Sequence, residues 1–227
     1  MNLNEIYATI EKIGCLTFTT MDGSTMHSRI VSVCGGDEEG LYFLTMTVKP
    51  FYRQLKANPQ VSMCGIYPSG RKDGKNDVGQ PYMAPGFFLR ITGEAREVPE
   101  DEVQKKAAAG SEPHQYALED AARYPAMRLF CIHKGKGELY DYDFEMEKRD
   151  HKLYRERFAF GGETFQQAGA RIDPDKCISC GECFEVCTFK AIKEDEDSYT
   201  VLSERCDECG NCILTCPQEA INLSRTI

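Results

Sequence analysis

The stretch CISCGECFEVCTFKAI, residues 177–192, recurs 29 residues further along the chain as CDECGNCILTCPQEAI, residues 206–221. Each copy spaces its cysteines as C-x2-C-x2-C-x3-C. Three cysteines on one tight loop can supply thiolates to one side of a metal–sulfur cluster, and the fourth must come from elsewhere. Gly181 and Gly210 follow the second cysteine of each copy and suit a loop that needs positive φ. This doubled cysteine ladder predicts a site for metal–sulfur clusters.

The ladder resembles the bacterial ferredoxin motif for two [4Fe–4S] clusters, in which the last cysteine of each copy binds the other cluster. Pro217 follows the last cysteine, as in that motif, whereas Thr188 stands where the first copy would have proline. Proline is not a ligand, so this departure should alter the loop and not the ligation. The resemblance implies that one cluster is held by Cys177, Cys180, Cys183 and Cys216, and the other by Cys206, Cys209, Cys212 and Cys187.

Zinc and disulfides explain the ladder less well than clusters do. Structural zinc usually takes two separated Cys-x2-Cys pairs. A disulfide framework needs a secreted chain, and no signal peptide is recognisable at its start. The remaining cysteines, Cys15, Cys34, Cys64 and Cys131, lie among apolar residues, so we expect them to be buried structural thiols.

The composition bounds the class of protein. A chain of 227 residues allows one large domain or two smaller ones. Residues 171–227 carry six Lys/Arg against twelve Asp/Glu, within a net charge of −9 for the chain. This acidity disfavours nucleic acid and could steer a basic redox partner, or it could simply keep the domain in solution. No stretch is apolar and long enough for a membrane helix, so we expect a cytoplasmic protein without a membrane partner.

The first three-quarters of the chain have the pattern of a small β-barrel with a few helices. Leu3–Ile13 carries a helical apolar stripe, and Pro50–Asn58 indicates a short helix that ends before Pro59. Asp22-Gly23 is a hairpin-turn signal between two strand-like runs. Further strands are predicted at 41–45, 61–67, 86–98, 129–133 and 137–142, and further helices at 100–109 and 115–123.

Two segments, GCLTFTTMDGSTMHSRIVSV (14–33) and LYFLTMTVKPFYRQLKANPQVSM (41–63), resemble the FMN-binding split-barrel family of the pyridoxamine 5′-phosphate oxidase type. The resemblance covers roughly residues 1–142. It implies a fold that is mainly β plus α+β: a split barrel followed by a ferredoxin-type domain. It also implies a homodimer with FMN at the subunit interface. We predict a barrel domain over 1–160, a linker over 161–170 and a cluster domain over 171–227.

The resemblance assigns a set of residues to FMN. The flavin phosphate needs hydroxyls, cations and free N–H groups, which the segment 45–53 offers at the start of a helix. In the family a lysine stands where this chain has Phe51 and an arginine where it has Pro50, so we assign the cation role to Lys49, and to Arg53 second; a solvated helix face is the alternative for both. The predicted FMN residues are Arg29, Ile30, Val31, Ser32, Leu44, Thr45, Thr47, Lys49, Arg53 and Gln54.

The segment 145–157 is dense in charges of both signs. Its basic side chains either complete a flavin or substrate pocket or form a salt-bridged surface. The basic residues concerned are Arg149, His151, Lys152, Arg155 and Arg157.

Clusters carry single electrons, whereas a flavin accepts one or two, so a fused pair favours an oxidoreductase. The predicted path joins an external donor, two clusters, FMN and a small-molecule acceptor. An electron carrier or redox sensor without substrate chemistry is the alternative, since no acid–base or nucleophilic constellation is recognisable in the barrel. A third hypothesis is a barrel that binds haem or a deazaflavin. Oxygen damages exposed clusters, so we expect an anaerobic cytoplasm and no pyridoxamine-phosphate oxidase activity.

Overall fold

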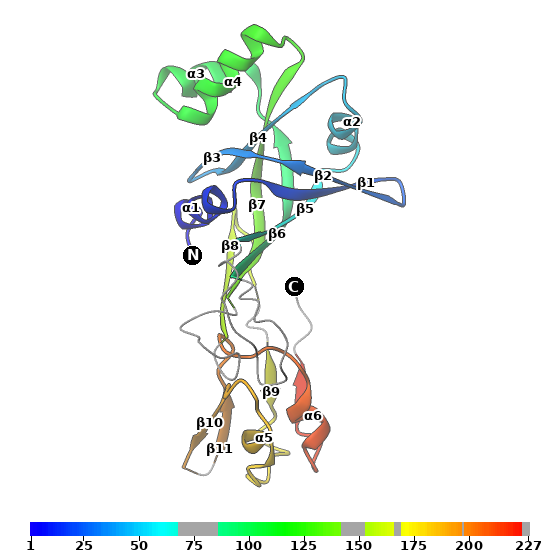
Figure 1. The fold of residues 1–227 in the computed structure, drawn as a ribbon, viewed down its shortest axis with the longest axis vertical. Helices are drawn as coiled ribbons and strands as arrows, with labels where there is room; N and C mark the ends of the chain where they lie inside the picture. The colour runs from blue at the N-terminus through cyan, green and yellow to red at the C-terminus, as the bar shows by residue number, and fades with distance from the viewer. Residues whose placement is uncertain (68–85, 142–152, 166–168, 197, 224–227) are drawn as a thin grey trace, which may run out of the picture. The chain divides into compact units, whose positions relative to one another are not determined.

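The computed structural model describes residues 1–67, 86–141, 153–165, 169–196 and 198–223 (Figure 1). The chain forms two compact units. The first contains residues 1–65, 89–137 and 158–164, and the second contains residues 66–88, 138–157 and 165–227. None of the described helices is long and apolar enough to span a membrane.

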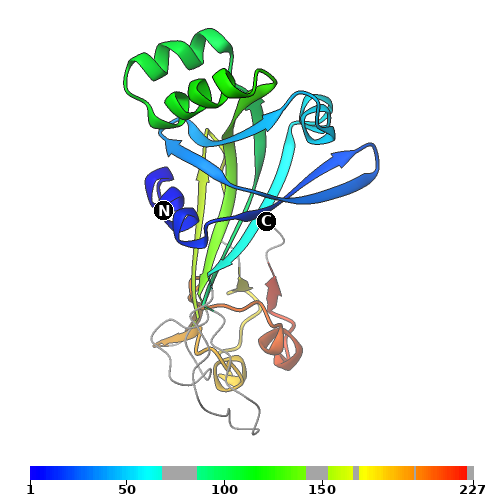
Figure 2. The same cartoon turned by 45° about the horizontal axis from the view of Figure 1, so that its top comes forward.

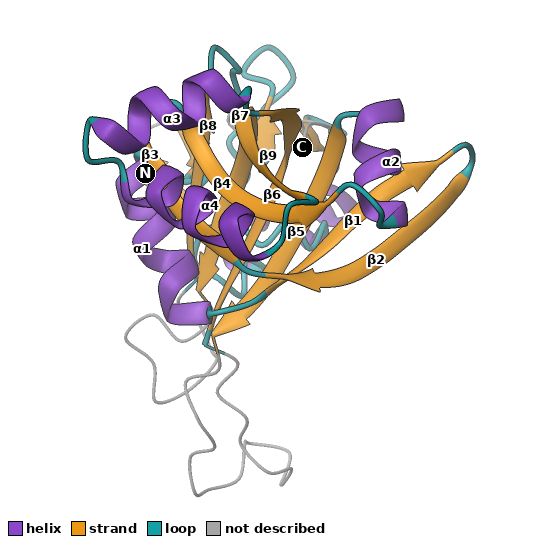
Figure 3. Cartoon of the chain, turned by 90° about the horizontal axis from the view of Figure 1, so that it is seen from above, coloured by secondary structure: helices purple, strands orange, loops and turns teal. Residues whose placement is uncertain are grey.

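The barrel sheet has the strand order β2-β1-β5-β6-β7-β4-β3, and β8 pairs with β7 (Figure 3). Strand β1 pairs antiparallel with β2 and β5, and β4 pairs antiparallel with β3 and β7. These strands confirm the predicted split-barrel class. Their bounds are β1 Leu16–Asp22, β2 Thr25–Val31, β3 Val33–Asp37, β4 Gly40–Met46, β5 Gln60–Tyr67, β6 Phe87–Glu97, β7 Met127–Asp141 and β8 Tyr154–Phe160.

In the described part of the chain, four helices accompany the sheet: α1 Leu3–Ile13, α2 Pro50–Ala57, α3 Glu100–Ala108 and α4 Glu112–Arg123. The α1 helix has the predicted bounds because its ends are encoded locally. The Asn2 side chain accepts from the Glu5 N–H at 3.0 Å, while the Glu5 carboxylate accepts from the Asn2 N–H at 2.8 Å. Ile6 and Ile10 then bury the apolar face of this helix. The α1 helix contacts β3 and β4, and α2 contacts β1 and β4.

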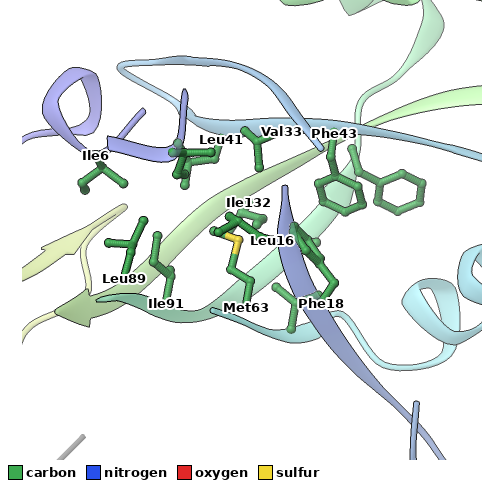
Figure 4. Packing of buried hydrophobic residues seen from close by; sticks show 14 of the residues in the cluster. Ile6, Leu16, Phe18, Val33, Leu41, Phe43, Met63, Leu89, Ile91 and Ile132 are labelled. Carbon is green, nitrogen blue, oxygen red and sulfur yellow. The ribbon is translucent and has the colours of Figure 1, made fainter. Parts of the chain in front are cut away.

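The barrel core forms where apolar side chains alternate along the strands (Figure 4). In β1, Leu16 and Phe18 are fully buried while their neighbours are half-exposed. Phe43 stacks on Phe51 and Phe130, with ring centroids 5.7 Å and 5.6 Å apart. Together with Phe18 on β1, these rings pack α2 against β1, β4 and β7, and so position the helix that carries the predicted FMN residues Arg53 and Gln54.

Four details differ from the sequence predictions. The hairpin turn is Gly23-Ser24, one residue later than predicted. Residues 129–141 form part of one strand, β7, and not two. Helix α4 begins at Glu112, with Pro113 inside its first turn, where a missing N–H costs nothing. Of the cysteines expected to be buried, Cys131 is buried and Cys34 is half-buried, but Cys15 and Cys64 are exposed.

The β7 strand stays continuous because its glycines admit a neighbouring backbone. A Cβ at Gly135 would lie 2.8 Å from the carbonyl oxygen of Thr92, and a Cβ at Gly137 would overlap the carbonyl oxygen of Arg90. Both carbonyls belong to β6, the strand next to β7. The two glycines therefore allow close approach and do not interrupt the strand.

The second unit repeats one supersecondary pattern twice. Strand β9 (Ala170–Ile172) pairs antiparallel with β12 (Ile221–Leu223), and β10 (Ile192–Asp195) pairs antiparallel with β11 (Ser198–Val201). Two short helices, α5 (Glu182–Glu185) and α6 (Asn211–Thr215), lie between these strands in sequence. Residues with positive φ recur at the 29-residue offset of the ladder: Ser179 with Glu208, Gly181 with Gly210 and Lys190 with Glu219.

Candidate functional site

Two cavities in the second unit sort the eight ladder cysteines into two groups of four. One cavity is lined by Cys177, Cys180, Cys183 and Cys216. The other is lined by Cys187, Cys206, Cys209 and Cys212. Each cavity thus takes three cysteines from one copy of the motif and one from the other, which is the grouping implied by the ferredoxin resemblance.

The local backbone explains how three cysteines of one copy reach one cavity. Gly181 and Gly210 precede α5 and α6 with φ of 80° and 83°, a left-handed turn that carries the chain from the second cysteine into the helix. The third cysteine, Cys183 or Cys212, then lies within that helix.

Backbone N–H groups donate to several of the sulfurs. The Ala191 N–H donates to Cys187 Sγ at 3.3 Å, and its counterpart at the 29-residue offset, the Ala220 N–H, donates to Cys216 Sγ at 3.4 Å. The Glu208 N–H donates to Cys206 Sγ at 3.4 Å. Donors of this kind stabilise thiolates and tune the potential of a bound cluster.

The donor set fits a cluster better than a single ion. Within the described ranges, no three His, Cys, Asp or Glu side chains are arranged to hold one metal ion. Zinc would draw its sulfurs to about 3.8 Å from one another, given Zn–S bonds of about 2.3 Å.

Burial raises the pKa of Cys183, and it raises the pKa of Cys212 to about 11. Both thiols must therefore lose protons when they bind metal.

A buried group of ion pairs lies against the second cavity. It consists of Glu138, Arg155, Arg157 and Glu208, which we call the charge clamp; all four residues belong to the second unit. Arg155 Nη1 donates to the carbonyl oxygen of Cys206 at 3.1 Å and lies 3.3 Å from Glu208. Arg157 Nη2 donates to Glu208 at 3.0 Å, and the Nε atoms of Arg155 and Arg157 lie 3.6 Å and 3.3 Å from Glu138.

The clamp holds the loop that follows Cys206. Burial raises the pKa of Glu208, but Arg155 and Arg157 outweigh it and hold this pKa below its usual value. The ionised carboxylate also accepts from the Gly169 N–H at 2.9 Å. Tyr140 donates to Asp207, and the Arg155 guanidinium lies 4.6 Å from the centre of the Tyr140 ring.

These contacts correct one expectation for the basic segment. Arg155 and Arg157 do not form a salt-bridged surface, since their side chains are 7% and 8% exposed and pair with acids of the second unit. Arg149, His151 and Lys152 lie outside the described residues. The sequence analysis did not single out Glu138, Tyr140 or Glu208. The position of Glu208 between two ladder cysteines could have identified it as a residue of the second site.

In the barrel unit, the structure brings two of the predicted FMN residues together. Arg29 on β2 donates to the Thr20 hydroxyl and to the Gln54 side-chain oxygen, both at 2.7 Å. Thr20 also donates to Gln54 at 2.7 Å, and the guanidinium lies 4.4 Å from the centre of the Phe51 ring. Burial lowers the pKa of Arg29. Thr20 and Phe51 were missed, although Thr20 lies diagonally opposite Arg29 in the hairpin register.

The start of α2 has the donors that a phosphate needs. Its N-cap, Lys49, makes no side-chain cap hydrogen bond, Pro50 occupies the first turn, and the first turn contains no acidic residue. The next N–H groups therefore face outward from the helix terminus without an intrahelical partner. Nearby on β4, Thr45 Oγ1 is buried and has no hydrogen-bond partner among the described residues. These features fit an anionic group such as the phosphate of FMN.

The other predicted FMN residues differ in exposure. Leu44, Val31 and Thr47 are half-buried. Ile30, Ser32, Lys49 and Arg53 are exposed, Ile30 to 67%. Lys49 and Arg53 thus have the exposure expected of a solvated helix face, and Arg29 is the predicted cation that the protein itself holds in place.

Two family models match the sequence. The model described as pyridoxamine 5′-phosphate oxidase matches residues 3–136, and the model described as a 4Fe-4S dicluster domain matches residues 170–223. The comparison with curated proteins gave no match.

Several solved structures are similar to the chain. A NimC/NimA family protein from Clostridium acetobutylicum is 17% identical over 70% of this chain and 92% of its own, with a TM-score of 0.48. PhzG from Burkholderia lata 383, in complex with tetrahydrophenazine-1-carboxylic acid, is 16% identical over 69% and 87%, with a TM-score of 0.44. A pyridoxamine 5′-phosphate oxidase-related, FMN-binding protein from Nostoc punctiforme PCC 73102 is 14% identical over 68% and 95%, with a TM-score of 0.41.

Proposed function

Because the chain belongs to the pyridoxamine 5′-phosphate oxidase family and also carries a 4Fe-4S dicluster domain, we propose that it is an oxidoreductase that passes electrons between an external donor, two [4Fe–4S] clusters, FMN and a small-molecule acceptor. The two matched domains by themselves indicate a flavin and iron–sulfur redox protein. The number of clusters, the identity of the flavin and the path of the electrons belong to the proposal.

The observation that carries the proposal is the sorting of the eight cysteines into two cavities. A chain that bound one structural metal would need only one group of four thiolates. Two such groups in one small unit support two clusters, which is the arrangement that moves electrons in ferredoxins. Cys177, Cys180, Cys183 and Cys216 would hold the first cluster, and Cys206, Cys209, Cys212 and Cys187 the second.

The barrel residues would bind and orient the flavin. Bound FMN supplies one- and two-electron chemistry, which lets single electrons from clusters serve a two-electron reduction. Arg29, held by Thr20 and Gln54, presents a fixed guanidinium. The N–H groups at the start of α2, with Thr45, Thr47, Lys49 and Arg53, would surround the phosphate. The backbone at 30–32 and Leu44 would flank the ring.

We propose a homodimer with FMN at the subunit interface, supported by the apolar edge of the barrel. The β2 strand is an edge of the sheet, and the β1–β2 hairpin extends beyond the neighbouring strands (Figure 2). Met26 and Ile30 on β2 are 71% and 67% exposed. An exposed apolar edge strand can pair with another chain.

The I30E variant tests this interface by light scattering and should be monomeric. The control variant L118E, on α4, should stay dimeric. An I30E dimer would contradict the proposed interface.

An electron carrier or redox sensor without substrate chemistry is the second candidate. One observation favours it: polar barrel residues that could serve in catalysis are held in structural contacts. His133 lies 3.6 Å from Glu94, and His114 is buried and hydrogen-bonded to Ser111 at 2.7 Å. Turnover of an aromatic or nitro acceptor under reducing conditions would support the oxidoreductase, whereas reduction of proteins alone would support the carrier.

An anaerobic titration of the reconstituted protein with dithionite tests the proposal. We expect the flavin absorbance to bleach and a reduced-cluster EPR signal to appear. A bound haem would show a Soret band before any reductant is added, and this would replace the flavin in the proposal. Absence of both flavin bleaching and a cluster signal would refute it.

A further inference from the structure

The two halves of the cluster domain are alike in cysteines and backbone turns but not in charge. At the 29-residue offset, Ile178 and Ser179 are the counterparts of Asp207 and Glu208. Neither counterpart can ionise to form an ion pair. The contacts of Glu208 with Arg155 and Arg157 therefore belong to the second half alone, although Ser179 and Glu208 share the same positive-φ backbone.

Three of the four clamp side chains are buried and Glu208 is half-buried, so these charges act at short range through a medium of low polarity. The side chains of Glu138, Arg155 and Arg157 are 6%, 7% and 8% exposed, and Glu208 is 25% exposed. Two cations and two carboxylates leave the group electrically balanced. Neutralising any one member leaves an uncompensated charge that water screens poorly.

The clamp also reaches the cluster ligands directly. Arg155 donates to the carbonyl oxygen of Cys206, and the backbone N–H of Glu208 donates to Cys206 Sγ. Residues 206–208 line the second cavity, and none of them lines the first, whose residues come from 172–183, 199 and 216–221. A change of charge in the clamp should therefore act on the second site far more than on the first.

We infer that the charge clamp makes the two clusters inequivalent, with Arg155 raising and Glu208 lowering the reduction potential of the cluster held by Cys206, Cys209, Cys212 and Cys187. Reduction of a cluster takes one electron from an external one-electron donor and adds one negative charge to the site. A nearby cation stabilises that charge and a nearby carboxylate opposes it. Arg155 and Glu208 are thus tuning residues that act through the Cys206 loop, and not ligands.

A potentiometric EPR titration of the reconstituted full-length protein tests this inference, which rests on the proposed cluster binding. R155Q should lower the reduction equilibrium constant of one cluster by on the order of tenfold, which corresponds to 59 mV for a one-electron couple. E208Q should raise the same constant by a similar factor. The other cluster should keep its potential in both variants.

The K193Q variant is the matched control. It also removes one charge from the second unit, but Lys193 is 59% exposed and pairs with Asp195 at the surface. Water should screen this change, so neither potential should move.

Opposite shifts in R155Q and E208Q separate electrostatic tuning from a structural role, which would move both variants the same way. Shifts of the same sign, equal shifts of both clusters, or shifts no larger than those of K193Q would overturn the inference. If R155Q fails to retain its second cluster, the isosteric E208Q decides by itself: an upward shift supports the inference, and no shift or a downward shift overturns it. Absence of clusters from the unmodified protein would instead refute the proposed function.

Discussion

Arg29 shows how a single side chain can be held in position to bind an anion before any ligand is present. Two neutral acceptors, Thr20 and Gln54, fix its guanidinium without neutralising it. We expect R29M to weaken FMN binding about 10- to 100-fold, because a charge-assisted hydrogen bond contributes about 1.5–3 kcal/mol. Fluorescence titration of the apoprotein with FMN measures this. R123M, at the exposed end of α4, should bind FMN normally; an unchanged dissociation constant for R29M would remove Arg29 from the site.

The cysteines make a sharper prediction, because two double variants discriminate crosswise from sequential ligation. C183S/C216S changes two thiolates of one cavity, so the other cluster should survive with about half the iron. C212S/C216S changes one thiolate in each cavity, although both lie in the same copy of the motif, so both clusters should be impaired. Iron analysis and EPR measure the outcome. The reverse result would indicate that each copy binds its own cluster.

Single residues also mark the limit of what the sequence could predict. The cysteine ladder was readable because four ligands repeat at fixed spacing within sixteen residues. Arg155 and Arg157 were visible as charges, but their burial was not, because Glu208 lies 51 residues beyond Arg157. Thr20 was missed because its partner Gln54 is 34 residues away. Local spacing carries ligand motifs, whereas pairings between distant residues appear only in the folded chain.

At the scale of elements, adjacent Gly161 and Gly162 provide a matched pair. Both have positive φ, 65° and 82°. A Cβ at Gly161 would overlap the carbonyl oxygen of His133 in β7, whereas one at Gly162 would meet nothing within 4 Å. G161A should therefore lose about 2 kcal/mol more unfolding free energy than G162A, since both variants share the positive-φ strain of about 1 kcal/mol. Denaturant unfolding of the two variants measures the difference; equal losses would contradict the packing seen at Gly161.

Elements were predicted well where their signals are local. The stripe and capping residues of α1 lie within its own sequence, so its bounds were correct. The β7 strand was predicted as two strands, 129–133 and 137–142, with Gly135 in the gap between them and Gly137 at the start of the second. Their role is to admit the backbone of β6, a contact with residues more than forty positions away that no local pattern contains. Glycine in a strand is ambiguous until its neighbour is known.

At the scale of the whole barrel unit, buried thiol and phenol groups limit the stability of the fold at alkaline pH. Burial raises the pKa of Cys34 and of Cys131 from 9.0 to about 12, and burial also raises the pKa of Tyr42. A thiol whose pKa is higher in the folded protein than in the unfolded chain stabilises the fold fully at pH values below its unfolded pKa. This stabilisation is lost as the pH rises from 9 towards 12. The unfolding free energy should fall above pH 9 by at most about 1.4 kcal/mol per pH unit for each thiol.

Anaerobic denaturant unfolding between about pH 8 and about pH 10.5, followed by tyrosine fluorescence, measures this slope. The C34A/C131A variant should show a shallower decline, because Tyr42 alone remains of the three groups. An unchanged slope in that variant would show that the two thiols already ionise in the folded barrel.

The paired turns of the cluster domain bear on how such a domain could arise. Ser179 and Glu208, Gly181 and Gly210, and Lys190 and Glu219 share their backbone conformation at one constant offset, and each cavity takes a cysteine from both halves. A half-length ancestor with one copy of the motif could not have enclosed a complete cavity. Two such peptides could have enclosed two, by exchanging their last cysteines. A single chain that holds both copies supplies both cavities by itself, and each half can carry its own charges, as the second does at Glu208.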